Sequence, residues 1–181
     1  MNFLIAKKLI NNEEKLINNE EDVKEALKAA FSAGSISALW GDWKIAKTTK
    51  ARSETGWDLV FKRNDGRQIL AIETKFVTNK SRASRFEPAL SAILIRKNPK
   101  LKNSQNEISQ KKIFYGIAFN KFDKDDKTDN FLEFIRKKRI QGTERGKVAW
   151  EKLYELGARY VFLVDDFTKK VEFYHWKYFL K

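Results

Sequence analysis

Two strand-like segments joined by an Asp-Gly turn limit the folds open to this chain more than any other feature of its sequence. The segments are Trp57 to Arg63 and Gln68 to Val77, and both are rich in aromatic and β-branched residues, which favour strands. Asp65-Gly66 lies between them, and this dipeptide is typical of the tight turns of hairpins. The sequence therefore predicts an antiparallel β-hairpin.

The register of this hairpin predicts that two carboxylates lie together. A loop centred on Asp65-Gly66 pairs Leu59 with Ile72, and Asp58 then falls opposite Glu73. Opposed residues have Cβ atoms about 4.5–5.5 Å apart, and like charges at that separation repel each other. The residues before Glu73 are apolar on both faces of the strand, which predicts a buried position in the middle of the sheet. A cation is therefore expected beside the carboxylate pair.

The residues next to this pair suit a metal-dependent hydrolase. Lys75 shares a strand face with Glu73, and the backbone carbonyl of Thr74 can reach the same place. Carboxylates, a carbonyl and water are the ligands that suit Mg²⁺, with Mn²⁺ as a substitute. Such a cation would polarise a phosphodiester and activate water, and a lysine can orient that water or stabilise a phosphate oxygen. An ordinary salt-bridge cluster on an exposed hairpin is the alternative.

The chain carries a large excess of positive charge. Its 37 Lys and Arg residues against 24 Asp and Glu residues leave a formal net charge of +13, which favours encounter with polyanions such as nucleic acids. A solvated basic surface without a specific partner would have the same composition. Cysteine is absent and His175 is the one histidine, so thiolate–metal sites are excluded. We expect His175 to be a strand residue beside packed aromatic rings.

The rest of the sequence alternates between helical and strand patterns without a Pro- or Gly-rich linker. We therefore expect an α/β fold with one mixed β-sheet flanked by helices, in a single domain. No apolar run approaches the ~20 residues of a membrane span, so we expect a cytoplasmic protein without a membrane partner. The further predicted helices are 20–31, 87–97, 130–139 and 143–156, and the further predicted strands are 43–49, 112–122, 159–164 and 171–178.

The segments Trp57-Asp58 and Ile72-Glu73-Thr74-Lys75 resemble the PD-(D/E)XK signature of the restriction-endonuclease-like nucleases, with Trp57 at the position of the proline. The order of elements in residues 20–122 is similar to the common core of that superfamily. The resemblance implies that Asp58 and Glu73 bind a divalent metal and that Lys75 is the catalytic lysine. It also implies cleavage products with a 5′-phosphate and a 3′-hydroxyl.

On this resemblance the chain, 1–181, is a single restriction-endonuclease-like domain. Residues 20–122 form its catalytic core, and 123–181 add helices and a terminal strand pair. Residues 1–19 are a peripheral extension with a tandem repeat, because KLINNEE occurs at Lys8 to Glu14 and again at Lys15 to Glu21. Two heptads are too few for a coiled coil, so we expect a frayed or peripheral helix there.

A further acidic ligand from the first helix is common in that superfamily. Glu25 is the favoured candidate here and Glu21 the second, although both could simply pair with Lys24 or Lys28. Glu54, which precedes the first hairpin strand, is a third candidate. These glutamates are therefore expected either at the metal or in ordinary helix ion pairs.

Basic residues flank the hairpin in sequence, and phosphate contacts are their natural role. A basic segment from Lys97 to Lys112 has few apolar residues and is predicted to be a loop that closes over a strand of nucleic acid. The candidate nucleic-acid-binding residues are Lys47, Lys50, Arg52, Lys80, Arg82 and Arg85.

The function predicted from these observations is a metal-dependent endonuclease for DNA, of the restriction, repair or junction-resolving kind. An RNA-cleaving nuclease or toxin with the same site is the first alternative, and DNA is preferred over RNA as the partner. A non-catalytic nucleic-acid-binding module with structural carboxylates is the second, and metal-dependent turnover distinguishes it from both nucleases. Cleavage of two strands would suit a homodimer, although no interface is specified by the sequence.

Overall fold

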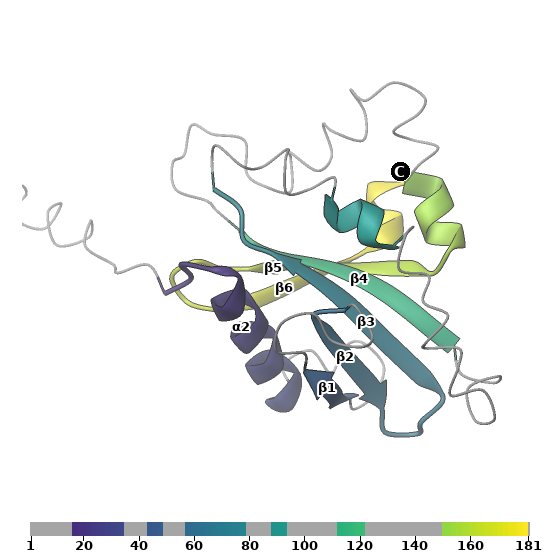
Figure 1. The fold of residues 1–181 in the computed structure, drawn as a ribbon, viewed down its shortest axis with the longest axis horizontal. Coiled ribbons are helices and arrows are strands. Elements are labelled where there is room, and N and C mark those ends of the chain that lie inside the picture. Colours follow the sequence, from purple (N-terminus) through teal and green to yellow (C-terminus); the bar gives the residue numbers. More distant parts are fainter. Residues whose placement is uncertain are drawn as a thin grey trace, which may run out of the picture.

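A computed structural model describes residues 16–34, 43–48, 57–78, 88–93, 112–121 and 150–180, although not the side chains of residues 46–48. These residues form a six-stranded mixed sheet with helices on both sides (Figure 1). This confirms the predicted α/β class and mixed sheet. The predicted helix 130–139, the first repeat copy and most of the basic loop lie outside the described residues.

The strands lie side by side in the order in which they occur in the chain, from β1 to β6. Strand β2 is antiparallel to both β1 and β3. Strands β3, β4 and β5 are mutually parallel, and β6 is antiparallel to β5. Two short helical stretches, 88–93 and 150–155, accompany the sheet. The other elements are α2 (Glu20–Ser32), β1 (Trp43–Thr48), β2 (Leu59–Arg63), β3 (Gln68–Lys75), β4 (Lys112–Asn120), β5 (Ala158–Val164), β6 (Val171–His175) and the 3₁₀ helix η3 (Trp176–Phe179).

The β2–β3 hairpin has the register that the sequence predicts. Leu59 pairs with Ile72 and Phe61 with Leu70. Gly66 adopts φ of 68°, which L side chains rarely tolerate, and its N–H donates to the carbonyl of Arg63 at 2.8 Å. The Asp-Gly turn therefore fixes which residues of the two strands face each other.

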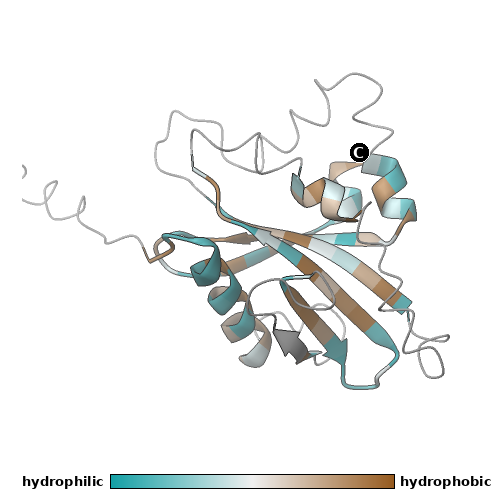
Figure 2. Cartoon of the chain, in the orientation of Figure 1, coloured by the Kyte–Doolittle hydropathy of each residue, from teal (hydrophilic) through white to brown (hydrophobic). Residues whose placement is uncertain are grey.

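Strand β3 lies in the middle of the sheet, hydrogen-bonded to β2 on one side and to β4 on the other. Every residue from Ile69 to Thr74 is buried, and Figure 2 shows the hydrophobic colour continuing along this strand and its neighbours. A carboxylate at the end of such a strand, Glu73, is therefore held inside the protein.

The two faces of the sheet carry separate hydrophobic clusters. On one face α2 packs against the sheet, and Phe31 stacks on Phe61 with ring centroids 3.9 Å apart. On the other face lie the 88–93 and 150–155 helices and η3, where Trp150 stacks on Trp176, also at 3.9 Å. No helix among the described residues is both long and apolar enough to cross a membrane.

The C-terminal strand is shorter than predicted. The sequence indicates strand from Val171 to Tyr178, but β6 ends at His175 and the next four residues form η3. Trp176 explains the difference, because its indole packs on Trp150 and each ring N–H donates to the backbone carbonyl of the other tryptophan. This burial in the core draws the chain out of the sheet.

The second repeat copy differs from the predicted peripheral helix. Ile17 is fully buried, and its N–H, with that of Leu16, donates to the backbone carbonyl of Asp166. Asn19 then starts α2 through a capping box with Asp22. Within this copy, residues 16–19 are thus a packed, non-helical lead into α2.

Candidate active site

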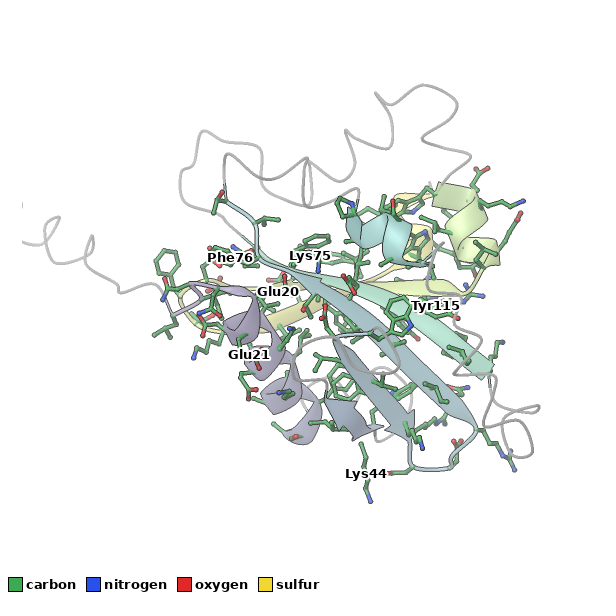
Figure 3. All side chains as sticks on the ribbon, in the orientation of Figure 1. Glu20, Glu21, Lys44, Lys75, Phe76 and Tyr115 are labelled. Atoms are coloured by element: carbon green, nitrogen blue, oxygen red, sulfur yellow. The ribbon has the colours of Figure 1, made fainter. Side chains whose placement is uncertain are left out.

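Three residues predicted from the hairpin meet where β3 ends beside α2. The ammonium Nζ of Lys75 lies 2.7 Å from Glu73 Oε1 and 3.9 Å from Asp58 Oδ2. Figure 3 shows Lys75 in the same region as Glu20, which belongs to the first turn of α2, with Lys44 at the other end of the molecule. The structure thus places Asp58, Glu73 and Lys75 in one ion-pair cluster.

Asp58 lies in a bend just before β2 rather than on the strand itself. Its Oδ2 accepts hydrogen bonds from the backbone N–H of Thr74 at 2.8 Å and from the Thr74 hydroxyl at 3.0 Å. Strand alternation predicts that the Thr74 side chain points away from the site. Because Asp58 lies in a bend, its carboxylate nevertheless contacts the Thr74 hydroxyl. Asp58 is thereby fixed by two donors of one buried residue.

The oxygens around Lys75 test whether these residues could hold a metal. Its ammonium donates to the Thr74 carbonyl at 2.7 Å, in addition to its contacts with the two carboxylates. The sequence predicts two carboxylates and one backbone carbonyl as ligands of a hard cation. In the structure, all three of these groups contact the ammonium of Lys75. Such an oxygen set fits Mg²⁺ or Mn²⁺, which usually add water and substrate phosphate.

Helix α2 contributes two charged residues that the sequence did not single out as site residues. Glu20 Oε2 lies 3.6 Å from Lys75 Nζ, and Lys24 Nζ lies 3.5 Å from Asp58 Oδ1. The two residues are one helical turn apart and form an i,i+4 ion pair with each other at 3.5 Å. Their i,i+4 spacing is a signal in the sequence, but which helix face meets the hairpin depends on packing.

The electrostatics of Lys24 reflect this acidic environment. Burial acts to lower the pKa of Lys24, but Asp58, Glu20 and Glu21 outweigh burial, so that the pKa is raised above its usual value of 10.5. The Lys24 ammonium therefore stays charged at neutral pH.

Burial distinguishes the cluster from an exposed surface salt bridge. The side chain of Glu73 is 3% exposed, whereas those of Lys75 and Asp58 are 15% and 20% exposed. Among the described residues, the carboxylates of Asp58, Glu20, Glu73 and the more exposed Glu21 lie around the ammonium groups of Lys24 and Lys75. Partly buried carboxylates favour positive partners, and a divalent cation would be one such partner.

The other predicted site residues have different positions. Glu25 pairs with Lys28 at 2.5 Å, and the 63% exposed Glu21 pairs with Lys24 and Lys28. Glu20 is therefore the α2 glutamate that contacts Lys75. Strand β1 includes Lys47, but the description does not extend to its side chain. Outside the described residues lie Glu54, Lys50, Arg52, Lys80, Arg82 and Arg85.

Among the described residues, no group of three or more His, Asp or Glu side chains has a metal-binding arrangement. The protein ligands that the hairpin could offer to a metal are Asp58, Glu73 and the Thr74 carbonyl, which is a backbone group. The remaining coordination positions would be filled by water and phosphate.

A neutral clamp holds the chain just beyond the cluster. The side-chain amide of Asn120, at the end of β4, accepts from Val77 N–H at 2.7 Å and donates to the Val77 carbonyl at 3.0 Å. Asn120 and Val77 are both fully buried. The clamp fixes the backbone two residues after Lys75.

Known proteins give little for comparison with this chain. No protein-family model matches it, and no curated protein matches it. A solved structure of SfsA from Pyrococcus furiosus in complex with Ca²⁺ is similar at a TM-score of 0.43 and 12% sequence identity. The match covers 91% of this chain and 65% of the SfsA chain, so this chain spans less than two thirds of the length of that structure.

Proposed function

We propose that the chain is a Mg²⁺-dependent endonuclease that hydrolyses phosphodiester bonds, with DNA as the substrate, at a PD-(D/E)XK-type site. One observation carries the proposal: the carboxylates of Asp58 and Glu73 and the carbonyl of Thr74 gather around one positive centre, the ammonium of Lys75. A buried strand end with this oxygen set is suited to bind a hard cation.

Each residue then has a role that follows from its contacts. Asp58, held by Thr74, and the buried Glu73 would bind the metal, which supplies Lewis acidity to the phosphate and a lower pKa to bound water. Lys75 lies within hydrogen-bond distance of Glu73 and would orient the attacking water or hold a phosphate oxygen. The cluster therefore contains groups that bind a metal and a group that positions the nucleophile.

The charge of the chain supports a polyanionic substrate. The net charge of the whole chain is +13. Such an excess of positive charge raises the local concentration of polyanions such as nucleic acid.

The test is cleavage of supercoiled plasmid, linear duplex, branched DNA and RNA by the purified protein with Mg²⁺, Mn²⁺ or EDTA. Cleavage should require the metal, favour DNA, and fall by about 10³-fold in Glu73→Ala because the metal site loses a ligand. Glu172→Ala is the matched control. It removes a glutamate of β6 that also pairs with a lysine, Lys121, at 3.3 Å. That control should cleave as the wild type does.

A non-catalytic nucleic-acid-binding module is the second candidate. It is favoured by the lysine contacts themselves, because Asp58 and Glu73 each have an ammonium partner in the described structure. Binding of nucleic acid without cleavage in any metal would support this candidate and contradict the nuclease. Equal cleavage by Glu73→Ala would exclude the cluster as the active site.

A further inference from the structure

The two carboxylate oxygens of Asp58 have different surroundings. Oδ2 accepts two hydrogen bonds from Thr74 and lies on the side of Lys75. Oδ1 instead lies 3.5 Å from the ammonium of Lys24 on α2. Lys24 is therefore the α2 ammonium beside Oδ1, and Lys75 is the hairpin ammonium beside Oδ2.

The position of Lys24 is set by the packing of α2. Val23 and Leu27 are fully buried against the sheet, and the capping box at Asn19 fixes the start of the helix. The Lys24 side chain is 14% exposed. Its ammonium is therefore held near Asp58 rather than extended into solvent.

Two other carboxylates lie within reach of the same ammonium. Lys24 Nζ is 3.5 Å from Glu20 Oε1 and 3.7 Å from Glu21 Oε2. If the ammonium leaves Asp58, it can remain paired with these two glutamates instead of becoming desolvated without a partner. Helix α2 thus already provides acceptors for the Lys24 ammonium at a position away from Asp58, which we call the displaced position.

We propose that Lys24 competes with the divalent cation for Asp58, so that metal binding requires the Lys24 ammonium to move from Asp58 toward Glu20 and Glu21. This inference rests on the proposed function, because it concerns the same metal site. Lys75 differs from Lys24 in that it contacts Glu73 and the Thr74 carbonyl. Lys24 limits metal loading, whereas Lys75 serves the reaction.

The expected effect is measured as metal affinity without nucleic acid. Mn²⁺ binding to Lys24→Met, followed by calorimetry, should be roughly ten-fold tighter than to the wild type, because a unit charge about 4 Å from a ligand carboxylate is removed. Lys24→Arg, which keeps the charge, should stay close to the wild type. Lys28→Met is the matched control, since Lys28 lies one turn further along α2 and pairs with Glu25 and Glu21.

A second variant removes one of the acceptors of the displaced ammonium, Glu21. Because its side chain is 63% exposed, the substitution should not affect folding. Glu21→Gln should weaken Mn²⁺ binding about two- to three-fold in the wild-type background, because the displaced ammonium loses an acceptor. The effect should vanish in the Lys24→Met background, as the coupling of a double-mutant cycle requires. An equal effect in both backgrounds would indicate general attraction of the metal and contradict the competition.

The outcomes separate this inference from the proposed function. Equal or weaker Mn²⁺ binding by folded Lys24→Met, with clear binding by the wild type, would overturn the competition and leave the metal site intact. Absence of Mn²⁺ binding to both proteins would overturn the competition and the proposed nuclease together. Tighter binding by Lys24→Met alone among the three lysine variants is the result we expect.

Discussion

Two buried polar groups near the end of β3 are satisfied in opposite ways. Asn120 is neutral, and its amide accepts from the N–H of Val77 and donates to the Val77 carbonyl, with a longer hydrogen bond to Asp166 Oδ2 at 3.4 Å. Glu73 belongs to a cluster in which it, Asp58 and Glu20 contact the ammonium groups of Lys75 and Lys24. The clamp is thus held by hydrogen bonds of a neutral amide, whereas the cluster is held by ion pairs.

On the proposed function, this difference separates a group that serves the fold, Asn120, from one that serves metal binding, Glu73. The buried Asn120 amide stabilises the fold because it makes the hydrogen bonds of the Val77 N–H and carbonyl. Without it, both backbone groups would be unsatisfied. A buried ion cluster contributes little net stability, because desolvation of the charges opposes their attraction. Metal binding, as proposed above, would give such a cluster at a strand end a role other than stability.

The largest expected effect on stability comes from removing the clamp. Asn120→Ala should lower the free energy of unfolding by about 3 kcal/mol, because both backbone groups of Val77 lose their partner inside the core. Glu73→Gln should change it by about 1 kcal/mol or less, because Lys75 keeps Asp58, Glu20 and the Thr74 carbonyl. Urea unfolding with an unchanged m-value would measure both.

For metal affinity we expect the reverse order, with a larger effect of Glu73→Gln than of Asn120→Ala. Glu73→Gln should lose Mn²⁺ binding, whereas Asn120→Ala should keep it at temperatures where the variant is folded. A loss of about 3 kcal/mol in Glu73→Gln would break the contrast and mark the cluster as a structural ion pair.

A smaller effect is expected at Thr74, which belongs to both the fold and the site. Thr74→Val removes the hydroxyl that donates to Asp58 Oδ2 at 3.0 Å but keeps the backbone N–H that donates at 2.8 Å. We expect a loss of about 1 kcal/mol in stability and about ten-fold in cleavage rate, because Asp58 is less well held. Thr74→Ser, which keeps the hydroxyl, is the control, and equal rates for both variants would exclude a positioning role.

Local signals in the sequence predict the hairpin part of the site well. The Asp65-Gly66 turn determines the pairing of Leu59 with Ile72, and the short distance between Asp58 and the β3 residues follows from that pairing. The buried position of Glu73 also follows, because the strand before it is apolar on both faces. Each of these features depends on residues close together in the chain.

Features that depend on tertiary packing were not predicted. Glu20 and Lys24 reach the hairpin because Val23 and Leu27 turn that side of α2 toward the sheet, and the helical period alone favours Glu25 equally. The end of β6 at His175 depends on the stacking of Trp176 on Trp150, which are far apart in the sequence. A local sequence pattern does not determine which way a helix is rotated toward the sheet, nor which distant aromatic rings stack on each other.

The smallest expected effect tests whether the protein loses stability in acid through His175, which lies beside the rings of Tyr154 and Tyr160. Burial, with the charges of Arg159 and Lys177, lowers the pKa of His175 below 6.5, and its neutral Nδ1 accepts from Lys177 N–H. The unfolded chain therefore binds the proton more readily, so this contribution to stability is present above about pH 6.5 and is lost as pH falls through the folded pKa. His175→Asn keeps an uncharged acceptor, so its Tm should fall less than that of the wild type between pH 7 and 5, by about 1–2 °C. Parallel pH profiles of Tm would exclude His175 as a source of acid sensitivity.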